Sequence, residues 1–168
     1  ELTVPTDQPV FKDGVEIRHF SVQHPRFWGF SIPLAQALRK AIQEVDIVHI
    51  HSLYLFHNLV AGHYCRKNNI PYLIRPHGTL DPFIYKRHRL RKSLMEMSFE
   101  RRNIQCAAAI HFTTDEEKIL AAPYIFQTPG IVVPHGLDLS EYESLPEQGA
   151  FRTRYPETDG KKIVLFFG

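Results

Sequence analysis

The sequence predicts a doubly wound α/β domain with a parallel sheet. Four short apolar runs, each ending in a histidine or hydroxyl residue, have the character of buried strands. Stretches with helical spacing of apolar residues separate these runs, and such alternation is typical of right-handed crossovers between parallel strands. The four runs are residues 46–52, 72–77, 107–114 and 131–136.

Composition is that of a globular protein. The 168 residues correspond to about one domain, and a hydrophobic content of 43% suffices for a core. The net charge of +2 does not by itself indicate nucleic-acid binding. Cys65 and Cys106 lack metal-ligand spacing, which predicts two buried thiols in a reducing compartment. No apolar run approaches the roughly 20 residues of a membrane span, and no signal-peptide pattern occurs, so we expect a cytoplasmic protein.

The first third of the chain predicts a short strand and a helix. Residues 15–20 alternate apolar and polar side chains, as does a strand near a sheet edge. Ser31, with Pro33 soon after it, marks a helix start, and the helix should end near Glu44. Its buried face recurs at helical spacing and comprises Leu34, Leu38, Ala41, Ile42 and Val45.

Three further helices are expected between the strands. The first begins near Leu55 and closes at Asn69, a residue type that tolerates left-handed geometry. The second is a single helix over residues 83–103, which lack proline and glycine. The third begins at Thr114, where Glu117 completes a capping box. In the second helix we expect a core-facing stripe of Leu90, Leu94, Met97 and Ile104.

Two domains are expected. Residues 1–160 form the α/β domain, and nothing before residue 7 introduces its sheet, so we expect its N-terminal part to be missing. Residues 161–168 read as a buried strand with glycine at its end, which predicts the start of a second domain.

The strand ends are the candidate functional region, because ligands of open parallel sheets bind beyond the carboxyl ends of the strands. His77 is followed by Gly78, which would let a ligand approach the backbone. From spacing alone, a sugar-contacting or catalytic imidazole and a plain turn histidine are equally good interpretations. His49 and His51 share one strand face, but no cysteine or carboxylate completes a ligand set, so no metal site is expected.

A cationic run lies within the predicted helix over residues 83–103. Such runs are usually solvated faces, but this one could also bind anionic lipid headgroups or a phosphorylated acceptor. Nucleic acid is a weaker candidate, because no aromatic side chains interleave the charges. The run contains Lys86, Arg87, Arg89, Arg91 and Lys92.

Taken together, four motifs resemble the N-terminal half of the family-4 retaining glycosyltransferases, which have two Rossmann-like domains (the GT-B architecture). They are DIVHIH (46–51), RPHGTLDP (75–82), ERR (100–102) before AAAIHFT (107–113), and VVPHGLD (132–138). The resemblance implies that His77 lies by the donor sugar as the catalytic histidine. It implies substrate binding by Gly78 and, more weakly, by Arg75, Thr79, His51 and Thr114. His135 departs from the asparagine common in the family, yet both residue types tolerate positive φ.

The resemblance also implies which parts lie elsewhere. The family's glycine-rich loop would precede Glu1, and the nucleotide-binding domain would follow Gly168. We therefore expect a full-length enzyme that transfers a hexose from a nucleotide sugar to a hydroxyl with retention, in polysaccharide or glycolipid synthesis. The 168 residues alone should be inactive, with no cofactor of their own.

Partners and alternatives follow from this reading. The expected partners are the nucleotide-sugar donor, a saccharide or lipid-linked acceptor and a peripheral membrane contact at the inner face of the membrane. Two alternatives remain open at this stage: a nucleotide-sugar epimerase of the same architecture, and a non-catalytic module that binds anionic surfaces.

Overall fold

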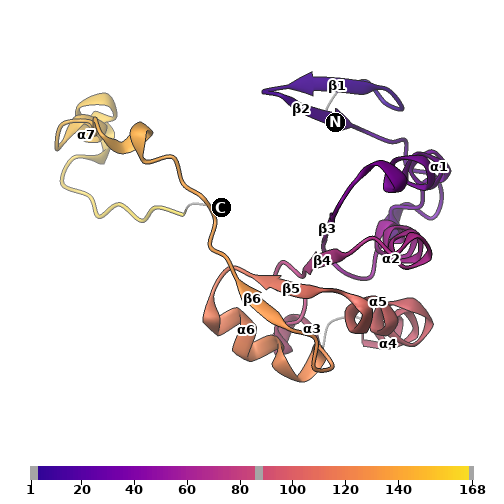
Figure 1. Cartoon of the computed structure of the whole chain (residues 1–168). Coiled ribbons are helices and arrows are strands. Elements are labelled where there is room, and N and C mark those ends of the chain that lie inside the picture. Colours follow the sequence, from indigo (N-terminus) through magenta and orange to yellow (C-terminus); the bar gives the residue numbers. More distant parts are fainter. Residues whose placement is uncertain (1–3, 86–88, 167–168) are drawn as a thin grey trace. The chain divides into compact units, whose positions relative to one another are not determined.

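The computed structural model describes residues 4–85 and 89–166 (Figure 1). The chain divides into two compact units, Glu1–Pro134 and His135–Gly168. The first contains the sheet and the candidate site. The second contains the short helix α7 (Ala150–Arg154) and two 3-10 turns, Leu139–Tyr142 and Pro156–Thr158.

The centre of the first unit is a four-stranded parallel sheet in the order β3-β4-β5-β6. The predicted α/β fold with a parallel sheet is thereby confirmed, and it is that of a Rossmann-like domain. From β4 on, each strand lies beside the strand that precedes it in the chain (Figure 1). The strands are β3 (Val48–His51), β4 (Tyr72–Arg75), β5 (Ala109–Phe112) and β6 (Gly130–Val132).

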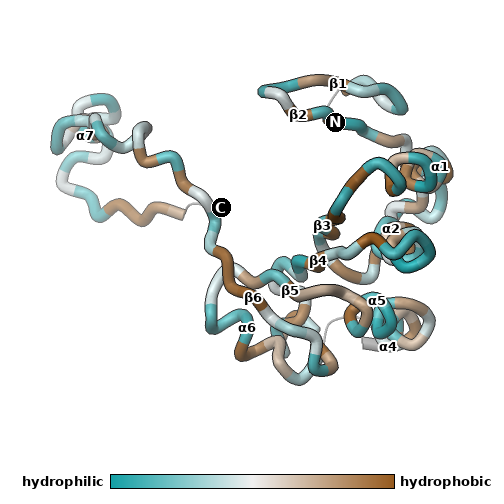
Figure 2. The backbone as a smooth tube through the Cα atoms, viewed as in Figure 1, coloured by the Kyte–Doolittle hydropathy of each residue, from teal (hydrophilic) through white to brown (hydrophobic). Residues whose placement is uncertain are grey.

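Alternation along the strands separates two different faces of this sheet. One face is buried and contributes Ile50, Tyr72, Ile74, Ile110 and Phe112 to the hydrophobic core. Helices and the loops between them supply the rest of that core, with Leu53, Leu80 and Ala107 coming from loops. Hydrophobic stretches of the chain are visible at β3 and β6 (Figure 2). The side chains that alternate with these core residues along the strands point to the opposite face. On that face His49 and His51 are exposed, and Arg75 and His111 are half-buried.

Three of the predicted helices begin as the sequence indicates. Ser31 caps α1 (Ile32–Ala41), its hydroxyl accepting from the Leu34 N–H at 3.2 Å, and a 3-10 turn, Ile42–Glu44, follows. Helix α2 (Phe56–Asn68) ends at Asn69, whose φ of 58° is left-handed. Thr114 caps α6 (Asp115–Ala121), which runs into the 3-10 turn Ala122–Tyr124.

The helix predicted over residues 83–103 is helical throughout its described part, but it contains a π-helical turn and its predicted core-facing stripe is wrong. The described part consists of α3 (Pro82–Tyr85), α4 (Arg89–Met95), a π-helical turn (Glu96–Glu100) and α5 (Arg101–Cys106). Because a π turn holds one more residue than an α turn, the stripe does not continue on one face. Ile104 is buried as expected, whereas Leu90, Leu94 and Met97 are 89%, 65% and 75% exposed.

The N-terminal segment forms a hairpin of two strands, of which the sequence predicted one. Residues 15–20 were expected to hold an edge strand, and β2 (Val15–Arg18) is that strand, but it pairs antiparallel with β1 (Pro9–Lys12) in a sheet of two strands. Asp13 and Gly14 connect them at φ of 52° and 78°, as a two-residue hairpin turn requires.

Other expectations meet mixed outcomes. Cys65 is buried as predicted, but Cys106 is exposed, and both are free thiols. The predicted strand over residues 161–168 is described to residue 166, and residues 161–166 form no strand. Over the described parts of the chain, no helix combines the length and the apolar character needed to cross a membrane.

Candidate functional site

The carboxyl ends of β3, β4 and β5 meet at one edge of the sheet. The Ser52 N–H after β3 donates to the Arg75 carbonyl of β4 at 2.8 Å, which fixes the first two strand ends together. Beyond β4 the backbone turns through two left-handed residues, His77 at φ 52° and Gly78 at φ 71°. A non-glycine residue in this region is uncommon and marks a constrained turn.

His77 is bonded to a histidine of the neighbouring strand. Its Nε2 lies 2.8 Å from Nδ1 of His51, and the two ring centroids are 5.1 Å apart. A further histidine, His57 of α2, donates from Nε2 to the His51 carbonyl at 2.7 Å. His51 therefore holds the imidazole of His77 at the strand ends, and His57 holds the backbone of His51.

Two more histidines extend this group across the sheet. Nε2 of His49 lies 3.2 Å from Nδ1 of His111, and Nε2 of His111 donates to the Val133 carbonyl at 2.9 Å. The rings of His49 and His51 are in contact, with centroids 4.5 Å apart. Partial desolvation, and then the positive charges nearby, lower the pKa of both His49 and His51 below the ordinary value of 6.5. Both imidazoles are consequently neutral near pH 7.

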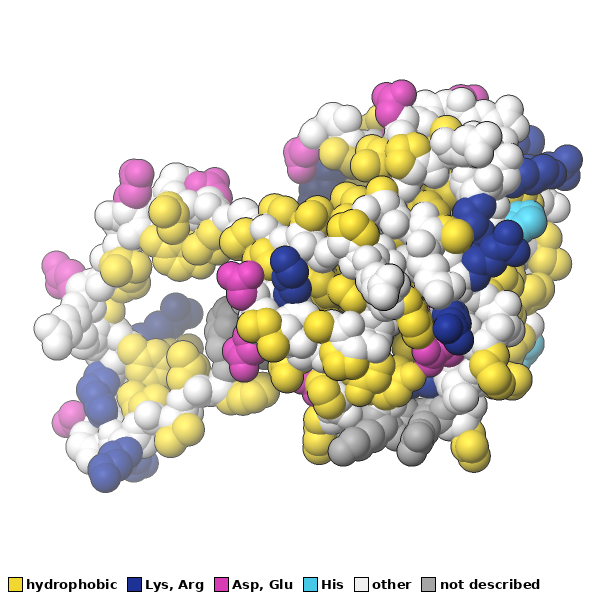
Figure 3. All heavy atoms as spheres, turned by 60° about the horizontal axis from the view of Figure 1, so that its bottom comes forward, with side chains coloured by type: hydrophobic (Ala, Val, Ile, Leu, Met, Phe, Trp, Pro, Cys, Tyr) yellow, Lys and Arg dark blue, Asp and Glu magenta, His cyan; other side chains and the backbone are white. Residues whose placement is uncertain are grey.

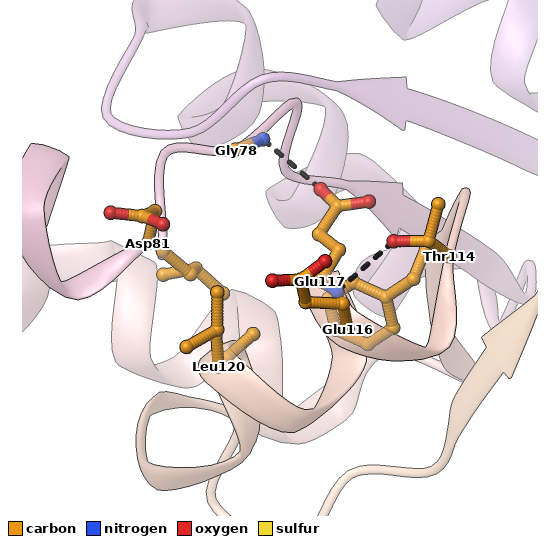
Figure 4. Close-up of a pocket in the computed structure, with 9 residues that line it drawn as sticks. Gly78, Asp81, Thr114, Glu116, Glu117 and Leu120 are labelled. Atoms are coloured by element: carbon orange, nitrogen blue, oxygen red, sulfur yellow. Dashed lines mark hydrogen bonds between the residues drawn. The ribbon is translucent and has the colours of Figure 1, made fainter.

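Gly78 is held by a carboxylate from another element. Glu117 Oε1 accepts from the Gly78 N–H at 3.1 Å (Figure 4). Its Oε2 accepts from the Thr113 N–H at 2.9 Å and from the Thr113 hydroxyl at 3.1 Å. Burial alone raises the pKa of Glu117, but these donors and the charge of Arg75 outweigh it, so the pKa lies below its usual value. An ionised Glu117 thus ties the turn after β4 to the end of β5.

A pocket of about 260 Å³ opens between this turn and α6. Its walls combine apolar side chains with the carboxylates of Asp81 and Glu116, which come from opposite walls (Figure 4). Carboxylates accept hydrogen bonds from hydroxyl groups, and apolar walls suit the C–H faces of a sugar ring. The lining residues are Gly78, Leu80, Asp81, Phe112, Thr114, Glu116, Glu117, Leu120 and Ala121.

The predicted substrate-binding residues fall into two groups. His51, Arg75 and His77 gather on the sheet side of the turn, where Arg75 lies opposite His51 in the strand register. Gly78 and Thr114 line the pocket. Thr79 takes a structural part, because its hydroxyl donates to the Pro76 carbonyl at 2.8 Å and closes the turn.

The predicted cationic surface is only partly described. Arg91 is exposed, with its guanidinium 5.3 Å from the centroid of the Phe27 ring. Lys92 does not belong to that surface, because it is 8% exposed and donates to the Ile84 carbonyl at 2.8 Å. Lys86 and Arg87 lie outside the described residues, as does the side chain of Arg89.

Two glutamates make long-range contacts that the sequence did not predict. Glu117 was expected to complete a capping box with Thr114, but its carboxylate accepts from Thr113 and from Gly78, 39 residues away in the chain, in place of the Thr114 N–H. Glu100 is fully buried and accepts from the Tyr54 N–H at 2.6 Å, and burial raises its pKa to about 7. Its presence in the ERR motif was the sole signal in the sequence. Within residues 4–85 and 89–166, no group of three or more His, Cys, Asp or Glu side chains is arranged to hold a metal ion.

Comparison with known proteins gives one match. A family model described as Glycosyltransferase Family 4 matches residues 2–141, which is most of the chain and includes the whole candidate site. No curated protein and no solved structure matches the chain.

Proposed function

The chain belongs to Glycosyltransferase Family 4, and from this premise we propose that it is the acceptor-side domain of a retaining hexosyltransferase. In this proposal a nucleotide sugar donates the hexose, a hydroxyl group of a saccharide or lipid-linked acceptor receives it, and the product belongs to a polysaccharide or glycolipid. His77 is the catalytic residue and contacts the donor sugar at the reaction centre.

The observation that carries the proposal is the turn formed by His77 and Gly78. Both residues have a left-handed backbone conformation. The imidazole of His77 lies against His51, and Gly78 lines the pocket. His51 supports the imidazole at 2.8 Å, and Glu117 supports the glycine at 3.1 Å. Such support from both sides favours a site that must be rigid before the substrate arrives.

The pocket beside Gly78 is the proposed acceptor site. The carboxylates of Asp81 and Glu116 would accept hydrogen bonds from acceptor hydroxyls, while Leu80 and Leu120 would pack on apolar ring faces. An acceptor held here would lie next to the turn that carries His77. The acceptor hydroxyl and the donor sugar would then meet at one point of the sheet edge.

The donor nucleotide is assigned to a second domain. Residues 161–166 form no strand here, and we propose that residues 161–168 become the first strand of that domain only when it is complete, after an acceptor-side domain of residues 1–160. We expect the 168 residues to lack transfer activity without the second domain. Among the described residues of this stretch, Val164, Leu165 and Phe166 are 94%, 81% and 91% exposed, so they are available to pack with further strands.

The test uses the full-length protein, a panel of nucleotide sugars and saccharide acceptors, with product analysis by chromatography. Formation of a new glycoside with the donor's anomeric configuration supports the proposal, whereas an isomerised nucleotide sugar would establish an epimerase instead. Two variants test His77. His77→Ala removes the imidazole, and His77→Asn removes it while keeping a residue type that tolerates positive φ.

Both His77 variants should lower kcat by about 100-fold or more, the usual cost of losing a donor aimed at the transition state. His63→Ala is the matched control, since His63 is exposed on α2 and its recorded contact is with the neighbouring Tyr64 ring. Normal transfer by His77→Asn would exclude the catalytic role.

A second property, contact with an anionic membrane surface, is favoured by one specific observation. Leu90, Leu94 and Met97 recur at helical spacing and are exposed, and Arg91 lies among them. Figure 3 brings forward the bottom of the view in Figure 1, and on this face hydrophobic side chains lie beside Lys and Arg side chains. An exposed apolar stripe with cations beside it suits the interface of an anionic bilayer, at the inner face of the membrane in this proposal.

A further inference from the structure

The histidines at the strand ends form a line of two hydrogen-bonded pairs, His111 with His49 and His51 with His77, and the rings of His49 and His51 are in contact. Nε2 of His111 must carry a proton, because its partner is the Val133 carbonyl, which can only accept. With the hydrogen on Nε2, the tautomer of His111 leaves Nδ1 as an acceptor, and Nε2 of His49, 3.2 Å away, is then the donor of the bond between them. One backbone oxygen thus determines the tautomers of two histidines on two strands.

The second half of the line leads to the turn after β4. His49 contacts His51 ring to ring, and His51 meets His77 through Nδ1 and Nε2 at 2.8 Å. Between these two nitrogens lies one hydrogen, so a neutral His51 with a proton on Nδ1 makes His77 an acceptor at Nε2, and the other tautomer of His51 makes His77 a donor there. The state of His51 therefore decides which nitrogen of His77 carries the proton.

The line is also fixed in space. His57 donates to the His51 carbonyl from α2, and Arg75 lies opposite His51 on β4. The groups that face His51 are thus His49 on its own strand, Arg75 on β4, His77 after β4, His111 on β5 and His57 on α2. All of them are cationic or can become so, and protonation of His51 is opposed from every side.

We propose that His51 is a positioning residue for His77, holding the imidazole and selecting its tautomer, with His49 and His111 as the continuation of the same line to Val133. This inference rests on the proposed function, because positioning by His51 affects transfer only if His77 is the catalytic residue. It adds to the proposed function that the rate of transfer depends on the hydrogen-bonding nitrogen of His51 as well as on His77.

The partner nitrogen of His51 makes a sharp substitution test possible. His51→Phe keeps a planar ring of similar size but has no nitrogen, while the amide of His51→Asn can occupy roughly the position of Nδ1. In the full-length protein, His51→Phe should lower kcat by about 3- to 10-fold, the loss of one net hydrogen bond, with KM nearly unchanged. His51→Asn should restore most of that loss. His63→Phe, the same chemical change at an exposed position of α2, should have no effect.

A second measurement needs neither activity nor a variant. In the full-length protein with ¹⁵N-labelled histidine, a scalar coupling across the hydrogen bond between Nδ1 of His51 and Nε2 of His77 should be observed at pH 7. The ¹⁵N shifts should also identify His111 as protonated on Nε2. These signals report the line directly, even if His51→Phe were to fold poorly.

The outcomes separate the two proposals. If His77→Asn abolishes transfer while His51→Phe leaves kcat unchanged, His51 is not a positioning residue, although the proposed function stands. If neither substitution lowers transfer, the part assigned to His77 fails as well. Equal losses in His51→Phe and His51→Asn, with no coupling between the two rings, would also overturn the inference.

Discussion

Glu117 and Gly78 are joined by a hydrogen bond of 3.1 Å between a carboxylate oxygen of α6 and the N–H of a left-handed residue after β4. The same carboxylate accepts from both donors of Thr113. Three donors therefore converge on one side chain, which makes the geometry of the turn after β4 depend on the end of β5.

Glu117→Gln should destabilise this junction. A glutamine offers one oxygen in place of two, so either Gly78 or Thr113 would face an amide NH₂ group and lose its acceptor. An unsatisfied donor of this kind costs about 1–3 kcal/mol, which urea denaturation of the chain, followed by fluorescence of Trp28, can measure. Glu116→Gln, the same change at the next residue, should alter stability by less than about 0.5 kcal/mol.

The pH dependence of this effect has a definite sign. Because the folded-state pKa of Glu117 is lowered, its contribution is complete above the usual value of 4.5 and is lost as the pH falls through the lower folded value. The difference in stability between the wild type and Glu117→Gln should therefore narrow below pH 4.5. A difference that grew on acidification would contradict this account.

Glu100 should show the opposite pH dependence. Its folded-state pKa is about 7 against an ordinary 4.5, because the carboxyl is fully buried. Between these values the unfolded chain releases a proton that the folded chain keeps, so stability falls as pH rises from 4.5 to 7. The stability of the wild type relative to Glu100→Gln should decrease by roughly 3 kcal/mol over that window. Glu44→Gln, at an exposed carboxylate, is the control, and a flat difference for Glu100→Gln would show that Glu100 is ionised throughout.

Gly62→Ala should destabilise the protein even though alanine favours helices by about 1 kcal/mol. A Cβ at residue 62 of α2 would lie 2.2 Å from Oδ1 of Asn103. Asn103 cannot easily move, because it is fully buried, its amide donates to the Asn58 carbonyl at 2.9 Å and its oxygen accepts from Arg66. Thermal unfolding should give a lower Tm for Gly62→Ala, while His63→Ala on the same helix should leave the Tm nearly unchanged. A raised Tm would contradict this prediction, because it would mean that α2 and α5 can move apart at residue 62 with no loss of stability.

Leu94→Gln should weaken binding to anionic vesicles if the exposed stripe of α4 enters a bilayer interface. Burying a leucine side chain contributes about 1.5–3 kcal/mol, so the partition coefficient in vesicle sedimentation should fall by about tenfold or more. Ile119→Gln is a matched control, since Ile119 is 71% exposed on α6. Equal binding by both variants, or binding indifferent to anionic lipid, would exclude this contact surface.

The sequence predicted the elements whose signals are local. The apolar runs identified β3 to β6, and the caps at Ser31 and Thr114 marked two helix starts. The apolar stripe predicted within residues 83–103 is wrong because a π-helical turn leaves no local signature, and its additional residue turns the side chains before it, such as Leu94, away from the face of those after it, such as Ile104. Leu94 was therefore expected in the core and is exposed.

The candidate site divides in the same way. Period two placed His49 and His51 on one face from the sequence alone. That His111 and His77 continue the line required the fold, because His111 contacts His49 across 62 positions of the chain and His77 contacts His51 across 26. Likewise, Thr114 and Glu117 were visible as a local cap, but the bond from Glu117 to Gly78 required the fold.

The strand order of the sheet has a consequence for how the protein is made. β4, β5 and β6 each pair with the strand synthesised just before them. Parallel pairing always spans a crossover and is therefore non-local, but pairing with the preceding strand closes a shorter loop than pairing with an earlier one would. As the chain leaves the ribosome, each of these three strands therefore finds its partner already synthesised and covers that partner's exposed edge when it pairs.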